Sequence, residues 1–286
     1  MRGALTAAAR LRVSADPAGG PPRVRWTHAW PVVLRQTDRG RTGAGGTARP
    51  ARVHLVHAAG GPLGGDDLAL AVDVGAGAAL AVRSAGATLV QPGAGAAAGT
   101  AARWAVHARV GAGSRLDWAP EPTVVADGAA LVSTLRVELA AGAGATVREV
   151  VVLGRHARRG GRCASGLDVV VDGVPLLAHT TVLDGADPGL CGPAGTAGAR
   201  AVGTLVRAGA AEPAPGALGA LAGEGGSVRW AWSTLDGPGA VLLAVGTPSA
   251  VTAVLDAAAA APGVAGPAAG DRAAARALPP APLATA

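Results

Sequence analysis

The chain has 286 residues, 25 basic and 19 acidic side chains, and a formal net charge of +6. Half of its residues are apolar, which excludes a largely disordered protein, and two cysteines are too few for a disulfide scaffold or a four-cysteine zinc site. The basic excess is modest and is not concentrated in one stripe, and tryptophan is the only aromatic residue besides histidine, so we expect no binding to nucleic acid.

Short runs of alternating apolar and polar residues, separated by glycine-rich turns, predict β-strands through most of the chain. Each run places its apolar side chains on one face of a strand. The clearest runs, in chain order, are residues 68–74, 80–82, 104–110 and 131–139.

A Gly-Ala-Gly pattern occurs three times, at residues 75–77, 111–113 and 142–144, each time between two strand-like runs. Glycine supplies the positive φ that a tight turn needs. The distances between the copies are uneven but fall in the range of about 20–50 residues that is typical of stacked repeat units. We therefore expect an all-β-dominated fold, an irregular β-helix-like stack of strands, with few helices near the C-terminal part.

The C-terminal third has a different composition. Residues 249–260 predict a helix with Ser249 as its N-cap, and the Ala/Gly/Pro-rich stretch 208–226 predicts a loop or a short helix. The expected organisation is a β-rich domain over residues 1–200, a small α/β portion over residues 201–262 packed on it, and a disordered Pro/Ala tail over residues 263–286.

No secretory signal or membrane span is expected, because the most apolar stretch, residues 240–261, is interrupted by Pro248 and Asp256. A cytoplasmic location is the corresponding expectation. Phosphate-loop, nucleophile-elbow and dinucleotide motifs are lacking from the sequence.

Two histidines stand close in sequence, His54 and His57. Positions three apart on a strand point to opposite faces, so the pair would not chelate one ion unless a turn intervened. A metal-dependent enzyme using His54, His57 and Asp66 is nevertheless one hypothesis, which requires a tightly bound metal with an open coordination position.

The most constrained segment, residues 53–67, has a strand, two Gly-Gly pairs on either side of Pro62 and Leu63, and then Asp66 and Asp67. The residues alone indicate a tight turn with a carboxylate held at a fixed place, and a hairpin with a capping aspartate satisfies the same pattern.

This Ala-Gly-Gly-x-x-Gly-Gly-Asp segment resembles the signature of the urease accessory protein family UreD, also called UreH. Three further segments resemble motifs of that family in the same order. They are Gly113-Ser-Arg-Leu-Asp-Trp118-Ala-Pro-Glu-Pro122-Thr123, Arg148-Glu149-Val-Val-Val-Leu-Gly-Arg155 and Asp172-Gly-Val-Pro-Leu-Leu177.

The resemblance implies a scaffold rather than an enzyme, with a strand-rich, helix-like stack. It implies docking of a UreF-type protein and a UreG-type GTPase on apo-urease, with nickel passing in transit through a polar internal tunnel and no tightly bound cofactor. Exposed apolar surface that includes Trp26 and Trp30 would provide a docking patch.

The tunnel positions implied by the resemblance are Asp66, Thr88, Glu149 and His179. The chain departs from the family pattern beside or at three of them: Leu89 stands where a lysine is usual, Arg148 replaces a tryptophan, and His179 replaces a glutamate. Nickel accepts carboxylate, imidazole and water, so weak, spaced donors suit a conduit better than a four-ligand cage. These departures also leave open a structural relative of the family without a role in nickel delivery.

Overall fold

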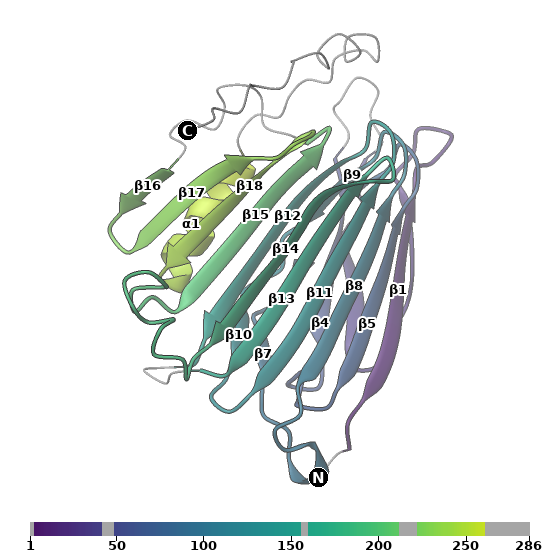
Figure 1. The fold of residues 1–286 in the computed structure, drawn as a ribbon. Helices are drawn as coiled ribbons and strands as arrows, with labels where there is room; N and C mark the ends of the chain where they lie inside the picture. Colours follow the sequence, from purple (N-terminus) through teal and green to yellow (C-terminus); the bar gives the residue numbers. More distant parts are fainter. Residues whose placement is uncertain (1–2, 42–48, 156–159, 212–221, 261–286) are drawn as a thin grey trace, which may run out of the picture.

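The computed structural model describes residues 3–41, 49–155, 160–211 and 222–260. Within these ranges the strands form two sheets that face each other, and one α-helix covers part of the larger sheet (Figure 1). The chain alternates between the two sheets from one strand to the next along much of its length. The predicted β-helix-like stack with few helices is confirmed.

The first sheet has seven strands, and its five central strands run parallel to one another. In spatial order they are β14 (Val174–Asp184), β13 (Arg162–Val171), β11 (Ala130–Leu139), β8 (Ala102–Val110), β5 (Asp67–Val74), β1 (Thr6–Ser14) and β2 (Arg23–Thr27).

The second sheet has eleven strands. Its main path is β16 (Ala222–Gly225), β17 (Val228–Thr234), β18 (Gly239–Gly246), β15 (Ala201–Gly209), β12 (Gly144–Leu153), β9 (Arg115–Trp118), β6 (Ala79–Ser84), β4 (Ala51–His57) and β3 (Val32–Asp38). Strand β10 (Thr123–Val125) pairs with β12 and with β7 (Thr88–Val90), and a short 3-10 helix covers Gly95–Ala97. The strands predicted from alternation correspond to β5, β6, β8 and β11.

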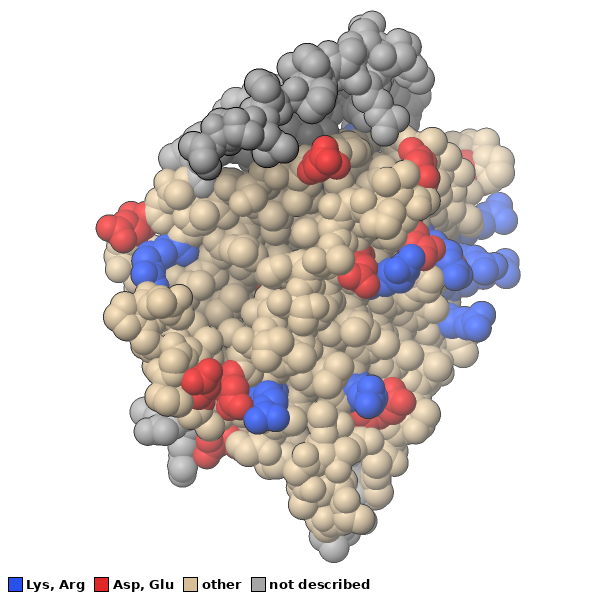
Figure 2. Space-filling model, in the orientation of Figure 1, with Lys and Arg blue, Asp and Glu red and all other residues tan. Residues whose placement is uncertain are grey.

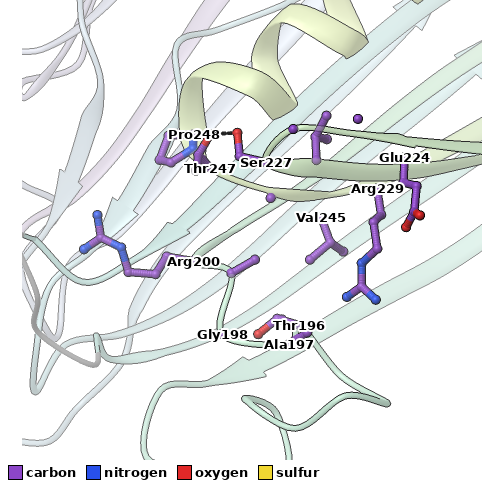
Figure 3. A pocket seen from close by; sticks show the side chains of 15 residues that line it. Thr196, Ala197, Gly198, Arg200, Glu224, Ser227, Arg229, Val245, Thr247 and Pro248 are labelled. Carbon is purple, nitrogen blue, oxygen red and sulfur yellow. Dashed lines mark hydrogen bonds between the residues drawn. The ribbon is translucent and has the colours of Figure 1, made fainter.

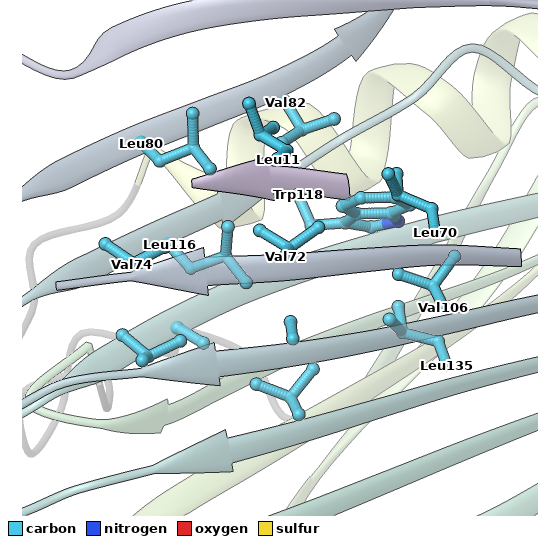
Figure 4. Packing of buried hydrophobic residues seen from close by; sticks show 14 of the residues in the cluster. Leu11, Leu70, Val72, Val74, Leu80, Val82, Val106, Leu116, Trp118 and Leu135 are labelled. Carbon is cyan, nitrogen blue, oxygen red and sulfur yellow. The ribbon is translucent and has the colours of Figure 1, made fainter. Parts of the chain in front are cut away.

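The main core fills the space between the sheets because alternate residues of each strand point into it. Trp118 of β9 is almost completely buried there and belongs to the same apolar cluster as Leu70 of the opposite sheet (Figure 4). Burial of each large aliphatic side chain contributes about 1.5–3 kcal/mol. The inward positions of the strands therefore fix which side chains can meet across the two sheets.

The Gly-Ala-Gly segments form stacked turns, but the third turn is shifted toward the N-terminus from its predicted alignment. The turn residues with positive φ are Gly77, Gly113 and Gly142, at 67°, 64° and 67°. In the first two segments this is the second glycine of the pattern, and in the third it is the first. Ala140 accordingly begins the third turn and accepts a hydrogen bond from the amide of Ala143 at 2.9 Å. The pattern misaligned the third turn because turn geometry requires glycine only where φ is positive.

Helix α1 (Pro248–Ala259) begins one residue before the predicted start, and its N-cap is Thr247 rather than Ser249. Proline suits the first helical position because its φ is already helical and its missing N–H would have no intrahelical partner. The helix packs on the outer face of the larger sheet, over Gly203, where an added Cβ would lie 2.5 Å from Val251 Cγ1. Glycine at this position allows the helix to approach the sheet closely.

Strands β15 to β18 continue the larger sheet, and together with α1 they enclose a second apolar cluster. The stretch 208–226, expected to be a loop or a short helix, instead contains the end of β15 and strand β16, with residues 212–221 outside the described ranges. The boundary between a 1–200 domain and a 201–262 portion stays a prediction, and the predicted tail 263–286 lies outside the described residues. The described part of the chain holds no helix long and apolar enough to cross a membrane.

Candidate functional site

Asp66 lies at the end of the glycine-rich turn, immediately before β5, and is 1% exposed. Its Oδ1 accepts a hydrogen bond from the Leu5 amide at 2.8 Å, and its Oδ2 accepts one from the Leu63 amide at 2.9 Å. The carboxylate thus caps the turn and joins it to the segment leading into β1. Gly64 is required beside it, because an added Cβ would lie 2.5 Å from the backbone nitrogen of Gly93.

Glu149 points into the space between the two sheets. It occupies an inward position of β12, between Val147 and Val151, which both belong to the buried apolar clusters. Among the described residues its carboxylate has no hydrogen-bond or ion-pair partner. Burial raises the pKa of Glu149 to about 7.

His179 faces the same space from β14 of the opposite sheet. Glu149 and His179 line one small cavity, which offers about 10 Å³ for the centre of a water-sized occupant. That is roughly room for a single water molecule. Two residues from separate segments of the sequence, one from each sheet, therefore meet across the interior.

Hydroxyl groups complete the lining of this cavity, which we call the inter-sheet cavity. Thr204 of β15 lies directly opposite Glu149 in the strand register, and Ser165 lies opposite Thr181 on β13 and β14. The Thr181 hydroxyl is 2.9 Å from His179 Nε2. Sequence reasoning missed these three hydroxyl residues, although a serine or threonine in the inward phase of an otherwise apolar strand is a readable signal.

Cys163 lies near this cavity on β13 and is completely buried. Burial raises the pKa of its thiol to about 12, and the charge of Glu149 contributes to the same shift. The thiol therefore stays protonated at neutral pH, and it is a neighbour of Glu149 rather than an anionic ligand.

Thr88 begins β7 and is half-buried, in register with Thr123 of β10. Thr123 pairs in turn with Val151 of β12, which follows Glu149 closely on that strand. Thr88 thus lies two strands from β12 in the same sheet, and it is not part of the lining of the inter-sheet cavity. Of the four predicted tunnel residues, the structure brings Glu149 and His179 together and leaves Asp66 and Thr88 at separate places.

The alternative triad of His54, His57 and Asp66 is not assembled. His54 points outward, with Nδ1 2.9 Å from the Thr37 hydroxyl, whereas His57 points inward and its ring stacks edge-on against Trp104 at 5.0 Å. Strand alternation separates the two rings, and the Asp66 carboxylate is bound to backbone amides. Within the described ranges no three His, Cys, Asp or Glu side chains converge as a metal site. The structure therefore does not bring these three residues together as a metal centre.

Arg148, the residue beside Glu149, points to the opposite face of β12 and is 4% exposed. Its guanidinium forms an ion pair with Asp256 of α1 at 2.5 Å and donates to the Pro120 carbonyl at 2.8 Å. It therefore fastens the helix to the larger sheet.

A much larger cavity, of about 740 Å³, lies apart from these residues along the sheet (Figure 3). It is formed where β16, β17 and the start of α1 meet the segment before β15. Arg229 and Glu224 line it, and the Ser227 and Thr247 hydroxyls are 3.0 Å apart at its side. The site residues predicted from the sequence do not contribute to it.

Comparison with known proteins adds an independent finding. Residues 6–276 match the family model described as UreD urease accessory protein. The chain is 40% identical to a urease accessory protein UreD of Parafrankia sp. over 264 residues, which cover 85% of this chain and 84% of the relative. It is 41% identical to the UreD of Frankia alni over 72% of this chain and 77% of the relative. It is 38% identical to the UreD of Streptomyces coelicolor over 85% of this chain and 91% of the relative.

Proposed function

The chain belongs to the UreD family of urease accessory proteins and serves urease maturation, and from this premise we propose how it does so. It acts as a non-catalytic scaffold that docks a UreF-type protein and a UreG-type GTPase on apo-urease. It conveys nickel, as a cargo and not as a resident cofactor, toward the urease active site. We place this work in the cytoplasm.

The observation that carries the nickel proposal is the meeting of Glu149 and His179 across the inter-sheet cavity. A carboxylate and an imidazole are both good ligands for nickel, and the hydroxyls of Thr181 and Thr204 are weaker oxygen donors. Two strong donors bind an ion more weakly than a complete cage would. The lining therefore favours passage over retention.

The protonation state of Glu149 supports the same proposal. With a pKa of about 7, its carboxyl group exchanges its proton easily near neutral pH. A metal ion must displace that proton to bind the carboxylate, so binding at this point is weakened by competition. The ion would release this proton to solvent as it binds, and the carboxylate would take up a proton from solvent again when the ion leaves.

The test is a maturation assay in which apo-urease and the other accessory proteins are produced with wild-type chain, with Glu149→Gln, or with His179→Ala. We expect nickel bound per urease active site, and urease activity with it, to fall several-fold with either variant. Glu138→Gln is the matched control, because Glu138 lies on the outer face of the seven-stranded sheet, where it pairs with Arg136 at 2.8 Å.

If all three variants load urease as the wild type does, the conduit through Glu149 and His179 is wrong. If wild-type chain itself leaves nickel loading unchanged, the scaffold proposal fails as well. The remaining interpretation would then be a structural relative of the family without a role in nickel delivery.

A further inference from the structure

The charge of this chain is strongly segregated along its sequence. The segment from Met1 to His57 holds ten of the 25 basic side chains, all of them arginines, but only two of the 19 acidic ones. The rest of the chain is slightly acidic, so the net charge of +6 arises entirely from this N-terminal segment. Such an asymmetry matters for binding only if the fold gathers these residues on one surface.

The fold gathers the described arginines of this segment at one end of the two sheets. Strand β2 is the last strand of the seven-stranded sheet and β3 is the last strand of the eleven-stranded sheet, with β1 and β4 beside them. Strands β1 and β3 contact each other across the interior, so both edges form one side of the molecule. Figure 2 shows basic side chains gathered on the right, where Figure 1 shows β1.

Three of these arginines are free to meet a partner. Arg10 and Arg25 on the outer face of the β1–β2 hairpin, and Arg52 on the outer face of β4, are exposed and have no ion-pair partner among the described residues. Arg25 lies directly opposite Arg12 in the strand register, and two like charges so placed repel each other. Asp73 lies 3.5 Å from Arg12 and neutralises only one of these two positive charges. An incoming negative charge would relieve the remaining repulsion.

The largest exposed apolar side chain of the described part lies in the same place. Trp30 is 61% exposed and sits in the β2–β3 connection, which joins the two sheet edges. The ring of His28 supports this connection. Its Nε2 lies 3.0 Å from Trp26 Nε1, and its Nδ1 lies 3.1 Å from the Leu34 amide nitrogen. In either neutral tautomer one ring nitrogen can accept, so at least one of these contacts is a hydrogen bond. Trp30 is therefore presented on a supported loop.

We propose that this basic edge, defined as Arg10, Arg25, Arg35, Arg52 and Trp30, docks an acidic surface of a protein partner. Tryptophan and arginine are the residues that most often dominate the binding energy of protein interfaces. The arginines spread over the outer faces of both sheets around one tryptophan. A strand of nucleic acid would instead call for a continuous basic groove with several stacking aromatics. The partner thus covers the edge from both sides, with Trp30 near the centre.

The experiment measures binding of the full-length chain to apo-urease and, separately, to the UreF-type protein, at low and high salt. The choice of these two probes rests on the proposed function. The variants are Arg10→Glu with Arg25→Glu, and Trp30→Ala. The matched control is Arg103→Glu with Arg229→Glu, which makes the same change of charge at exposed arginines on β8 and β17, away from the edge.

We expect wild-type binding to one of the two proteins to weaken with salt, and each edge variant to raise its Kd by about tenfold. The control should bind as the wild type does, and circular dichroism should show that every variant is folded. The inference is overturned if the edge variants bind like wild type, if the control loses as much affinity, or if wild type binds neither protein. It is also overturned if the edge variants lose affinity only for duplex DNA or for vesicles of anionic lipid.

The two proposals fail in different ways. Edge variants that bind and load urease with nickel normally would refute the basic edge and leave the scaffold function intact. A wild-type chain that binds through the edge but never raises nickel loading would refute nickel delivery and leave the edge inference standing.

Discussion

Replacing Glu149 by glutamine should change how the stability of this protein depends on pH. Glutamine has nearly the same shape as a protonated glutamate, and it cannot ionise in the space between the sheets. The groups that face Glu149 are the neutral thiol of Cys163 from β13, the His179 ring from β14 and the Thr204 hydroxyl from β15. No described arginine forms an ion pair with a charge at this position.

The magnitude follows from the displaced pKa. Burial raises the pKa of Glu149 from 4.5 to about 7, so the folded state favours the protonated form. The contribution of Glu149 to the unfolding free energy is therefore fully present below pH 4.5 and is lost as the pH rises through 7. The difference between the two pKa values corresponds to about 3 kcal/mol at pH 8, an upper bound because Glu149 keeps part of its surface exposed.

The assay is urea unfolding of wild type and Glu149→Gln at pH 5 and pH 8. We expect wild type to lose up to about 3 kcal/mol of unfolding free energy relative to the variant between these two values. Glu138→Gln provides the control, because Arg136 lowers the pKa of Glu138 below 4.5, so its contribution to stability is lost only at lower pH and the change between pH 5 and pH 8 should match that of wild type. Parallel curves for wild type and Glu149→Gln would show that the carboxylate is solvated and would refute the reasoning.

Two further predictions concern other buried groups. Burial lowers the pKa of His57 to about 4, so the unfolding free energy of wild type should fall by up to about 3 kcal/mol as the pH falls from 6.5 through 4. The variant His57→Phe keeps an aromatic ring against Trp104 and should lose less unfolding free energy over the same range. Urea unfolding at pH 7 and pH 4.5 measures both losses, and equal losses for wild type and variant would contradict this reasoning. Asp256→Ala leaves the buried guanidinium of Arg148 without its carboxylate and should cost about 1–3 kcal/mol, measured as a lower Tm, while adding Arg148→Met should recover part of the loss. A single variant as stable as wild type would show that the ion pair does not fasten α1.

Local patterns in the sequence were sufficient to predict the strands and most of the turns. Alternation of apolar residues marks β5, β8 and β11, because each inward side chain must be apolar to pack between two sheets. Glycine marks the turns because positive φ is costly for other residues. The displacement at Gly142 was missed, since three glycine pairs look alike in sequence and only the hydrogen bonds distinguish which glycine closes the turn.

The start of the helix shows a similar limit. Ser249 and Thr247 are both good N-caps, and N-cap preference alone does not choose between them, although Pro248 is favoured at the first helical position and so pointed to Thr247. Packing of Val251 on Gly203 decides where the helix lies, and that contact joins segments that are distant in the chain.

The candidate site could be predicted only in part from the sequence. The motif resemblance singled out Glu149 and His179, but whether two side chains from different segments meet depends on strand register and on how the sheets face each other, which are long-range properties. The same holds for the basic edge: the excess positive charge of the N-terminal segment up to His57 can be read from the sequence, because charge is a property of composition. That these residues form one surface depends on the folded chain, because pairing of β1 with β2 and of β3 with β4 places them at the ends of two sheets that pack against each other.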